Sequence, residues 1–222
     1  MPAVALLEGE RILAEASAGG PAEGGDALLP AIDSLLGQAA ISLADLDGFA
    51  LAIGPGSFTG LRVGLATLKG LAFEDPRPVA AVSTLAALAR RAGDPRPEPV
   101  AALLDARRGE LYGAVWDAGH RPEPRVAEGL HRIEALAARL PARCLLVGDA
   151  VEPNLPALRA RLGSGVRPLP TGAQGPCAGH VGILGARALG AGLGSSAGEL
   201  VPRYLRRAEA EARRRARGGG PR

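Results

Sequence analysis

The chain has 222 residues, enough for one large domain or two small ones, and its 47% hydrophobic residues can fill a sizeable core. Its formal net charge of +3 is small, and 3% aromatic residues leave no aromatic stripe on which nucleic-acid bases could stack. No uninterrupted apolar run approaches the roughly 18 residues of a membrane span, and no basic segment leads into an apolar stretch at the N-terminus. These features indicate a globular cytoplasmic protein without a membrane or DNA partner.

The chain opens with a strand pattern and continues with a helix pattern. Residues 3–16 read as two apolar strands around a short polar turn that contains a glycine. In the helix that follows, Asp26 can cap the first turn, and apolar residues recur at helical spacing. This apolar stripe consists of Leu28, Leu29, Ile32, Leu35 and Leu36.

Two short strand patterns follow, at residues 48–53 and 79–82. Ser83 can cap a helix that begins directly after the second strand.

A glycine-rich passage, GPGSFTGLRVGLATLKGLA at residues 54–72, fails both common phosphate-loop templates. A P-loop needs lysine directly after its closing glycine, where Leu61 stands, and the dinucleotide fingerprint needs a third glycine where Thr59 stands. Backbone N–H groups at the helix start could still hold an anion. We favour the plainer interpretation, a sharp turn in which Ser57 or Thr59 caps the helix. The candidate anion-binding residues of this turn are Gly56, Ser57 and Thr59.

The helix within this passage has an apolar stripe and a ridge of small residues. Each interior glycine costs about 1 kcal/mol relative to alanine, so two or more of them require a compensating contact. A low ridge lets two helix axes approach nearer than the usual separation of about 8–10 Å. We therefore predict close packing against another helix, in the same chain or in another subunit. The apolar stripe is Leu61, Leu65, Leu68 and Ala72, and the ridge is Gly60, Gly64 and Thr67, with Ala66 and Gly70 beside it.

Residues 93–99 (GDPRPEP) contain three prolines and mark the best boundary between two lobes. We predict an N-terminal lobe at 1–98, a C-terminal lobe at 99–207 and a basic tail at 208–222. Strand and helix patterns alternate after the break, which indicates an α/β protein whose helices cover its sheets.

Each predicted lobe opens with a related strand-turn-strand unit. AVALLEGERILAEA near the start resembles VAALLDARRGELYGAV after the proline break, so the chain reads as a duplication. Two alignments of these units remain open. If the AVALLEG strand instead corresponds to the strand at residues 111–116, the first lobe lacks its opening strand.

The end of the chain is basic. Residues 203–222 hold eight arginines and two glutamates, a net +6, so the first 202 residues carry −3. Such a segment can contact RNA phosphates, because each cation displaces a condensed counterion. A solvated, fraying helix end is the interpretation that we favour, since nothing apolar orders the segment. The two cysteines, Cys144 and Cys177, fit cytosolic free thiols rather than a disulfide framework.

Four blocks of the sequence resemble the TsaB (YeaZ) family: GPGSFTGLRVGLATLKGLA, VAAVSTLAALA, ALLDARRGELYGAV and PRYLRR, in this order. The resemblance implies a two-lobed actin/sugar-kinase/Hsp70-like (ASKHA) fold with duplicated mixed sheets. It also implies a role in making N6-threonylcarbamoyladenosine beside the anticodon of tRNAs that read ANN codons. In that system a TsaB-type protein is a non-catalytic partner of the transferase TsaD, and TsaE supplies an ATPase.

The same resemblance implies an interface. Two helices of TsaB-type proteins pack against the equivalent pair of a second TsaB or of TsaD, and tRNA is reached through the complex. The implied interface residues are Leu28, Leu29, Ile32, Leu36, Gly60, Gly64, Thr67 and Gly70.

The resemblance also implies candidate nucleotide residues in the second lobe. The pattern D-A-R-x-x-E-x-Y is matched by Asp105, Arg107, Glu110 and Tyr112, and Asp105 sits where ATPases of this fold hold a metal-bound carboxylate. A lone carboxylate at a hairpin turn is more often a turn residue. No cofactor is assigned to this chain alone, and ATP or ADP at the interface of the complex is left open.

The catalytic paralogue carries an HxxxH metal pair, whereas the three histidines of this sequence show no such spacing, so we expect no metal site. A small-molecule kinase or ATPase of the same fold is the alternative function, and it would need a phosphate loop after the first strand.

Family members open with a strand and loop of the type LALDTST before the segment that matches residues 3–16. We therefore expect roughly ten codons to be missing upstream of Met1, since the loss of a central strand would leave backbone groups unpaired at about 1–3 kcal/mol each.

Overall fold

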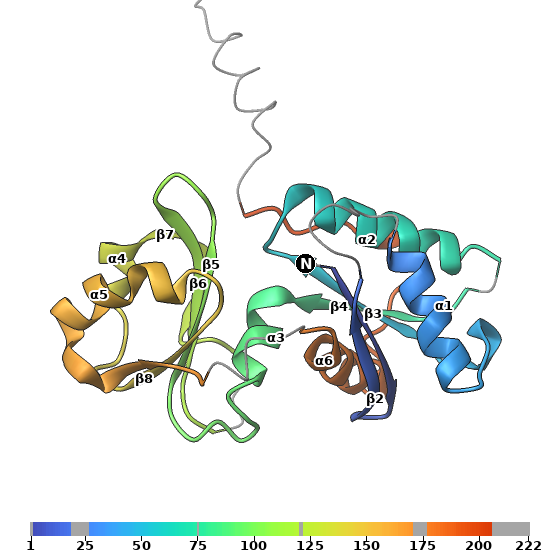
Figure 1. Ribbon diagram of the computed structural model, residues 1–222, viewed down its shortest axis with the longest axis horizontal. Coiled ribbons are helices and arrows are strands. Elements are labelled where there is room, and N and C mark those ends of the chain that lie inside the picture. Colours follow the sequence, from blue (N-terminus) through green and yellow to red (C-terminus); the bar gives the residue numbers. More distant parts are fainter. Residues whose placement is uncertain (1, 19–26, 75, 120–121, 171–176, 206–222) are drawn as a thin grey trace, which may run out of the picture.

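The computed structural model describes residues 2–18, 27–74, 76–119, 122–170 and 177–205. Two lobes lie side by side, each built on β-strands with helices on their faces (Figure 1). The predicted boundary at residues 98 and 99 stays a prediction, and the tail at 208–222 and Asp26 lie outside the described residues.

The first lobe contains two separate two-stranded sheets. Strand β1 pairs with β2 in an antiparallel hairpin, and β3 pairs with β4 in parallel. Helices α1 and α2 pack on β1 and β3 respectively, while α6 packs against all four strands. These elements are β1 (Ala3–Glu8), β2 (Arg11–Ser17), α1 (Leu28–Gln38), β3 (Phe49–Gly54), α2 (Phe58–Leu71), β4 (Val79–Ser83) and α6 (Ala178–Gly190).

Helix α6 approaches the strands closely because glycines face them. A Cβ placed on Gly182 would clash with the side chain of Leu7 in β1, and one on Gly185 would clash with Ala50 in β3. The glycines thus let one helix from the second half of the sequence lie against both sheets of the first lobe.

The second lobe is a single five-stranded mixed sheet in the order β7-β6-β5-β8-β9. Helices α4 and α5 contribute to the core on one face, and α3 to the core on the other. In the central strand β5, Val100, Ala101, Ala102 and Leu103 are fully buried. These elements are α3 (Thr84–Arg90), β5 (Val100–Asp105), β6 (Glu110–Trp116), β7 (Val126–Arg132), α4 (Ile133–Ala137), β8 (Cys144–Val147), α5 (Val151–Leu162) and β9 (Val166–Pro168).

Short 3-10 helices complete the described chain at Leu43–Asp45, Gly163–Gly165 and Ala197–Glu199. Ser83 caps α3 as expected, since its side chain accepts a hydrogen bond from the Ala86 N–H at 3.2 Å. Within the described ranges, no helix has the length and apolar character that crossing a bilayer requires.

The two lobes share one strand plan, with one difference. The β1–β2 hairpin corresponds to the antiparallel β6–β7 pair, and the parallel β3–β4 pair corresponds to β8–β9. This decides between the two alignments of the repeat, because β1 matches the strand at Glu110–Trp116 rather than β5. Among the described residues of the first lobe, no strand pairs with both β1 and β3 as β5 does with β6 and β8.

Candidate functional site

The turn before α2 is held by a cap and by close backbone contact. The Ser57 side chain accepts a hydrogen bond from the Gly60 N–H at 3.3 Å, so the predicted cap is confirmed. Gly54 has φ +121°, and a Cβ there would lie 2.6 Å from the Arg203 carbonyl oxygen. This glycine therefore admits a second segment of backbone. Anion binding by Gly56, Ser57 and Thr59 stays a prediction.

The cap makes a quantitative prediction. Ser57→Ala should lower the free energy of unfolding by about 0.5–2 kcal/mol, whereas Ser57→Gly should lower it by only a few tenths. Urea unfolding of the three proteins measures the difference. Equal losses in the two variants would contradict a capping role for the hydroxyl.

Helix α2 turns its apolar stripe inward and leaves part of its ridge in the open. Leu68 and Ala72 are buried, and Leu65 packs on the same core. Among the described residues, no atom lies within 4 Å of the Cβ position of Gly70, whereas the Cβ position of Gly64 lies 3.4 Å from the Leu51 Cδ1 of β3. The small residues of α2 therefore do not all pack against one neighbouring element of the described chain.

Helix α1 lies beside α2 on the same face of the first lobe (Figure 1). Leu28 is buried in its own chain, which leaves it little surface for a partner. Leu29 is 55% exposed, and Phe73, just after α2, is 84% exposed. We call the outer surface of α1 and α2 the two-helix face. Its members are Leu29, Ile32, Leu36, Gly60, Thr67, Gly70 and Phe73.

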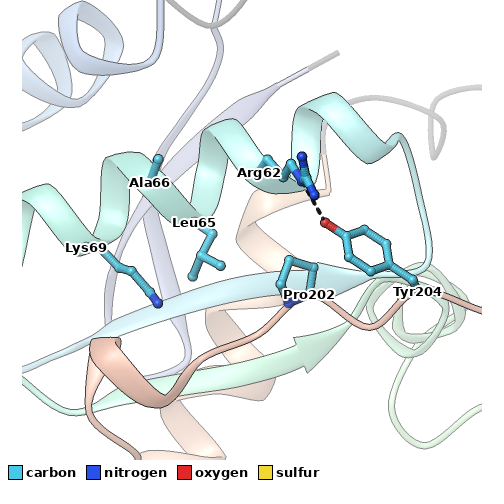
Figure 2. Close-up of a pocket in the computed structure, with 6 residues that line it drawn as sticks. All are labelled: Arg62, Leu65, Ala66, Lys69, Pro202 and Tyr204. Atoms are coloured by element: carbon cyan, nitrogen blue, oxygen red, sulfur yellow. Dashed lines mark hydrogen bonds between the residues drawn. The ribbon is translucent and has the colours of Figure 1, made fainter. Parts of the chain in front are cut away.

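A groove of about 330 Å³ runs between α2 and the segment near the end of the described chain (Figure 2). The Arg62 Nε donates to the Tyr204 hydroxyl at 3.2 Å, and the guanidinium lies 4.0 Å from the centre of the Phe58 ring. The Phe58 and Tyr204 rings lie 4.8 Å apart between centroids. The groove is lined by Arg62, Leu65, Ala66, Lys69, Pro202 and Tyr204.

Arg203 fixes this segment to both lobes. Its backbone N–H donates to the Ile53 carbonyl at 2.7 Å, and its Nη1 donates to the Glu128 carboxylate of β7 at 2.8 Å. Glu128 is 8% exposed and also accepts the Ser83 hydroxyl. Sequence reasoning missed this contact and the groove, although PRYLRR was among the blocks that carry the resemblance.

The second-lobe candidates lie in the turn between β5 and β6. The Asp105 carboxylate accepts the Arg107 N–H at 2.7 Å and lies 3.3 Å from the Arg107 guanidinium. The Asp105 N–H donates to the Asp149 carboxylate at 2.8 Å. Asp105 thus acts as a turn residue, and Glu110 faces Arg132 across the strand pair. These contacts connect neither Asp105 nor Glu110 with the turn before α2.

Burial suppresses the reactivity of the thiols. It raises the pKa of Cys144 to about 12 and that of Cys177 to about 11, so both are protonated at neutral pH and neither is an activated nucleophile. Burial and nearby arginines also lower the pKa of His131 and His180. His131 lies in β7 rather than in a loop. The described ranges contain no cluster of three or more His, Cys, Asp or Glu residues that could hold a metal ion.

Comparisons with known proteins place the chain in a family. Residues 25–139 match the family described as "TsaD: tRNA N6-adenosine threonylcarbamoyltransferase". The chain is 43% identical over 86 residues to the tRNA threonylcarbamoyladenosine biosynthesis protein TsaB of Haemophilus influenzae, covering 38% of this chain and 36% of that protein. It is 40% identical over 100 residues to the TsaB of Escherichia coli, covering 43% of this chain and 42% of that protein. These matches span less than half of either relative.

The structural likeness is broader. The solved structure of YeaZ from Pseudomonas aeruginosa matches with a TM-score of 0.73 and 31% identity, over 91% of this chain and 93% of that one. The predicted α/β fold class is confirmed by this match, and the chain belongs to the TsaB (YeaZ) family.

Proposed function

We propose that this protein is a non-catalytic subunit of the cytoplasmic machinery that makes N6-threonylcarbamoyladenosine beside the anticodon of tRNAs reading ANN codons. Its partners are a TsaD-type transferase, a TsaE-type ATPase and a second copy of itself, and it reaches tRNA through the complex. The printed names of its relatives support the pathway.

The observation that carries the proposal is the two-helix face. Leu29 of α1 and Phe73, just after α2, expose apolar surface there, and no atom of the described residues lies within 4 Å of the Cβ position of Gly70. Gly70 lies in the last turn of α2, where a glycine is a weaker helix former than alanine, and the described residues supply no close contact there. A helix pair of a partner subunit would supply that contact.

A non-catalytic role agrees with the chemistry of the described side chains. Both thiols are protonated at neutral pH, and the Asp105 carboxylate is engaged in its own turn. A kinase or ATPase would need a carboxylate free to hold a metal-bound nucleotide.

The experiment combines the purified chain with a TsaD-type transferase and measures complex mass by light scattering. We expect a stable assembly, and in cells we expect deletion of the gene to remove threonylcarbamoyladenosine from tRNA. Mass spectrometry of digested tRNA measures the modification. ATP turnover by this chain alone, without assembly, would contradict the proposal and favour an ATPase.

A further inference from the structure

The groove beside α2 is largely apolar and carries a cation at each end. Leu65 and Pro202 lie between Lys69 at one end of the groove and Arg62 at the other (Figure 2). Tyr204 closes the Arg62 end and is 38% exposed. The two cations are seven positions apart on one helix, so their backbones lie about 10 Å apart. Because the two side chains lie at opposite ends, one carboxylate does not reach both.

Neutral oxygens of the described residues accept the hydrogen bonds of these cations. Arg62 donates to the Tyr204 hydroxyl, and the Lys69 Nζ donates to the Gly198 carbonyl at 3.1 Å. Glu199 follows Gly198 in the chain, but its carboxylate accepts a backbone N–H at 3.1 Å within its own 3-10 turn. In the part of the chain that the structure describes, neither cation forms an ion pair, so the groove attracts acidic groups.

The sequence adds positive charge directly after the groove. The described chain ends at residue 205, next to Tyr204, and residues 206–222 hold seven arginines and two glutamates. Positive charge around a binding surface speeds the association of acidic partners. Val201, the residue before Pro202, is 71% exposed and extends the apolar surface beside the groove. Charge and polarity together therefore favour a partner that is both acidic and apolar.

The groove lies on a different side of α2 from the two-helix face. Its α2 residues recur at helical spacing and form one stripe. They are Arg62, Leu65, Ala66 and Lys69. Gly60 and Thr67 of the two-helix face each precede one of the two cations by two positions, which is about 200° around the helix. The groove is therefore a second surface of α2, separate from the one assigned to a helix pair.

We propose that this groove binds an acidic peptide segment of a partner protein. One carboxylate of the segment pairs with Arg62, a second pairs with Lys69, and a large apolar side chain between them packs on Leu65 and Pro202. An extended chain rises about 3.3 Å per residue, so two acidic residues three positions apart match the spacing of the cations. The apolar floor offers no hydrogen-bonding groups to base edges, which favours a peptide over RNA.

The test selects peptides on the whole chain. A library of random short peptides displayed on phage is first depleted on an Ala66→Glu variant and then enriched on the parent protein. We expect the enriched peptides to share two acidic residues about three positions apart with Leu, Ile, Phe or Trp between them. One enriched peptide is labelled with fluorescein, and its affinity is measured by anisotropy. The affinity should fall as salt rises, because salt screens both ion pairs.

Two matched variants show where the peptide binds. Ala66→Glu adds a negative charge at the centre of the stripe, and the fold tolerates it because Ala66 is exposed and glutamate is a good helix former. The peptide should bind this variant about tenfold more weakly or worse. Ala160→Glu is the same substitution at an exposed position of α5, and it should bind the peptide as the parent does.

Lys69→Glu tests the charge contact itself. Selection on this variant should return peptides in which Lys or Arg replaces one of the two acidic residues. The proposal is overturned if that selection returns the same acidic pair, if the parent enriches peptides without acidic residues, or if it enriches none. An RNA oligonucleotide of mixed sequence is measured in the same assay. If the groove binds this RNA and no peptide, and Ala66→Glu abolishes that binding, the site is a nucleic-acid site and the proposed occupant is wrong. Each measurement uses this chain alone, so its result does not depend on assembly with a transferase.

Discussion

An alanine at position 148 is expected to lower the free energy of unfolding by about 2–5 kcal/mol, the combined effect of overpacking and of an unfavourable backbone conformation. Gly148 follows β8 with φ +114°, which L residues rarely adopt. A Cβ there would clash with the Leu103 carbonyl oxygen and lie 2.9 Å from the carbonyl carbon. Leu103 is fully buried in the central strand, and its carbonyl accepts the Ala150 N–H, so this backbone cannot shift without loss.

Gly163→Ala separates the steric effect from the conformational one. Gly163 also has a positive φ, +78°, but no atom lies within 4 Å of its Cβ position. Its φ of +78° with a ψ of −166° is a region nearly confined to glycine, so we expect a loss of about 1–3 kcal/mol there. Urea unfolding, followed through the fluorescence of Trp116, measures both variants in the second lobe. If Gly148→Ala lowers the free energy of unfolding no more than Gly163→Ala does, the backbone after β8 can relax around the added methyl group.

Local patterns predicted the elements of this fold well where one short stretch determines the structure. Ser57 and Ser83 cap their helices because a hydroxyl before a helix accepts an N–H within three residues. The strands at Val100–Asp105 and Cys144–Val147 are continuous apolar runs, as strands covered on both faces must be. The repeat was also visible in the sequence, but its alignment required the pairing of the strands.

Contacts between distant residues could not be predicted in this way. The Glu128 carboxylate accepts hydrogen bonds from Ser83 and Arg203, which lie 45 and 75 positions away in the sequence. No local sequence pattern predicts these contacts. The small residues of α2 illustrate the same limit. Periodicity placed Gly70 beside the ridge that contains Gly64, but it could not tell which of the two glycines packs within the chain. Gly64 faces Leu51, whereas no described atom lies within 4 Å of the Cβ position of Gly70.

This difference makes Gly70 the position at which to test the two-helix face. Gly70→Leu should leave the fold intact, because the side chain enters open space and leucine is the better helix former by up to about 1 kcal/mol. If a partner helix packs closely there, the added side chain should weaken assembly with a TsaD-type transferase, and self-association, by about tenfold or more. Sedimentation of the variant alone and with the transferase measures both affinities.

Gly190→Leu is the matched control, because Gly190 ends α6, is exposed and has no atom within 4 Å of its Cβ position. The Gly190→Leu variant should keep its affinity for the transferase and for a second copy, because α6 packs on the strands of the first lobe and is not part of the two-helix face. Gly64→Leu is the less informative variant, because it would press on Leu51 and change the fold together with the face. A folded Gly70→Leu protein that assembles as well as the parent would show that no helix approaches α2 closely. The exposed Leu29 and Phe73 would then need another partner to cover them.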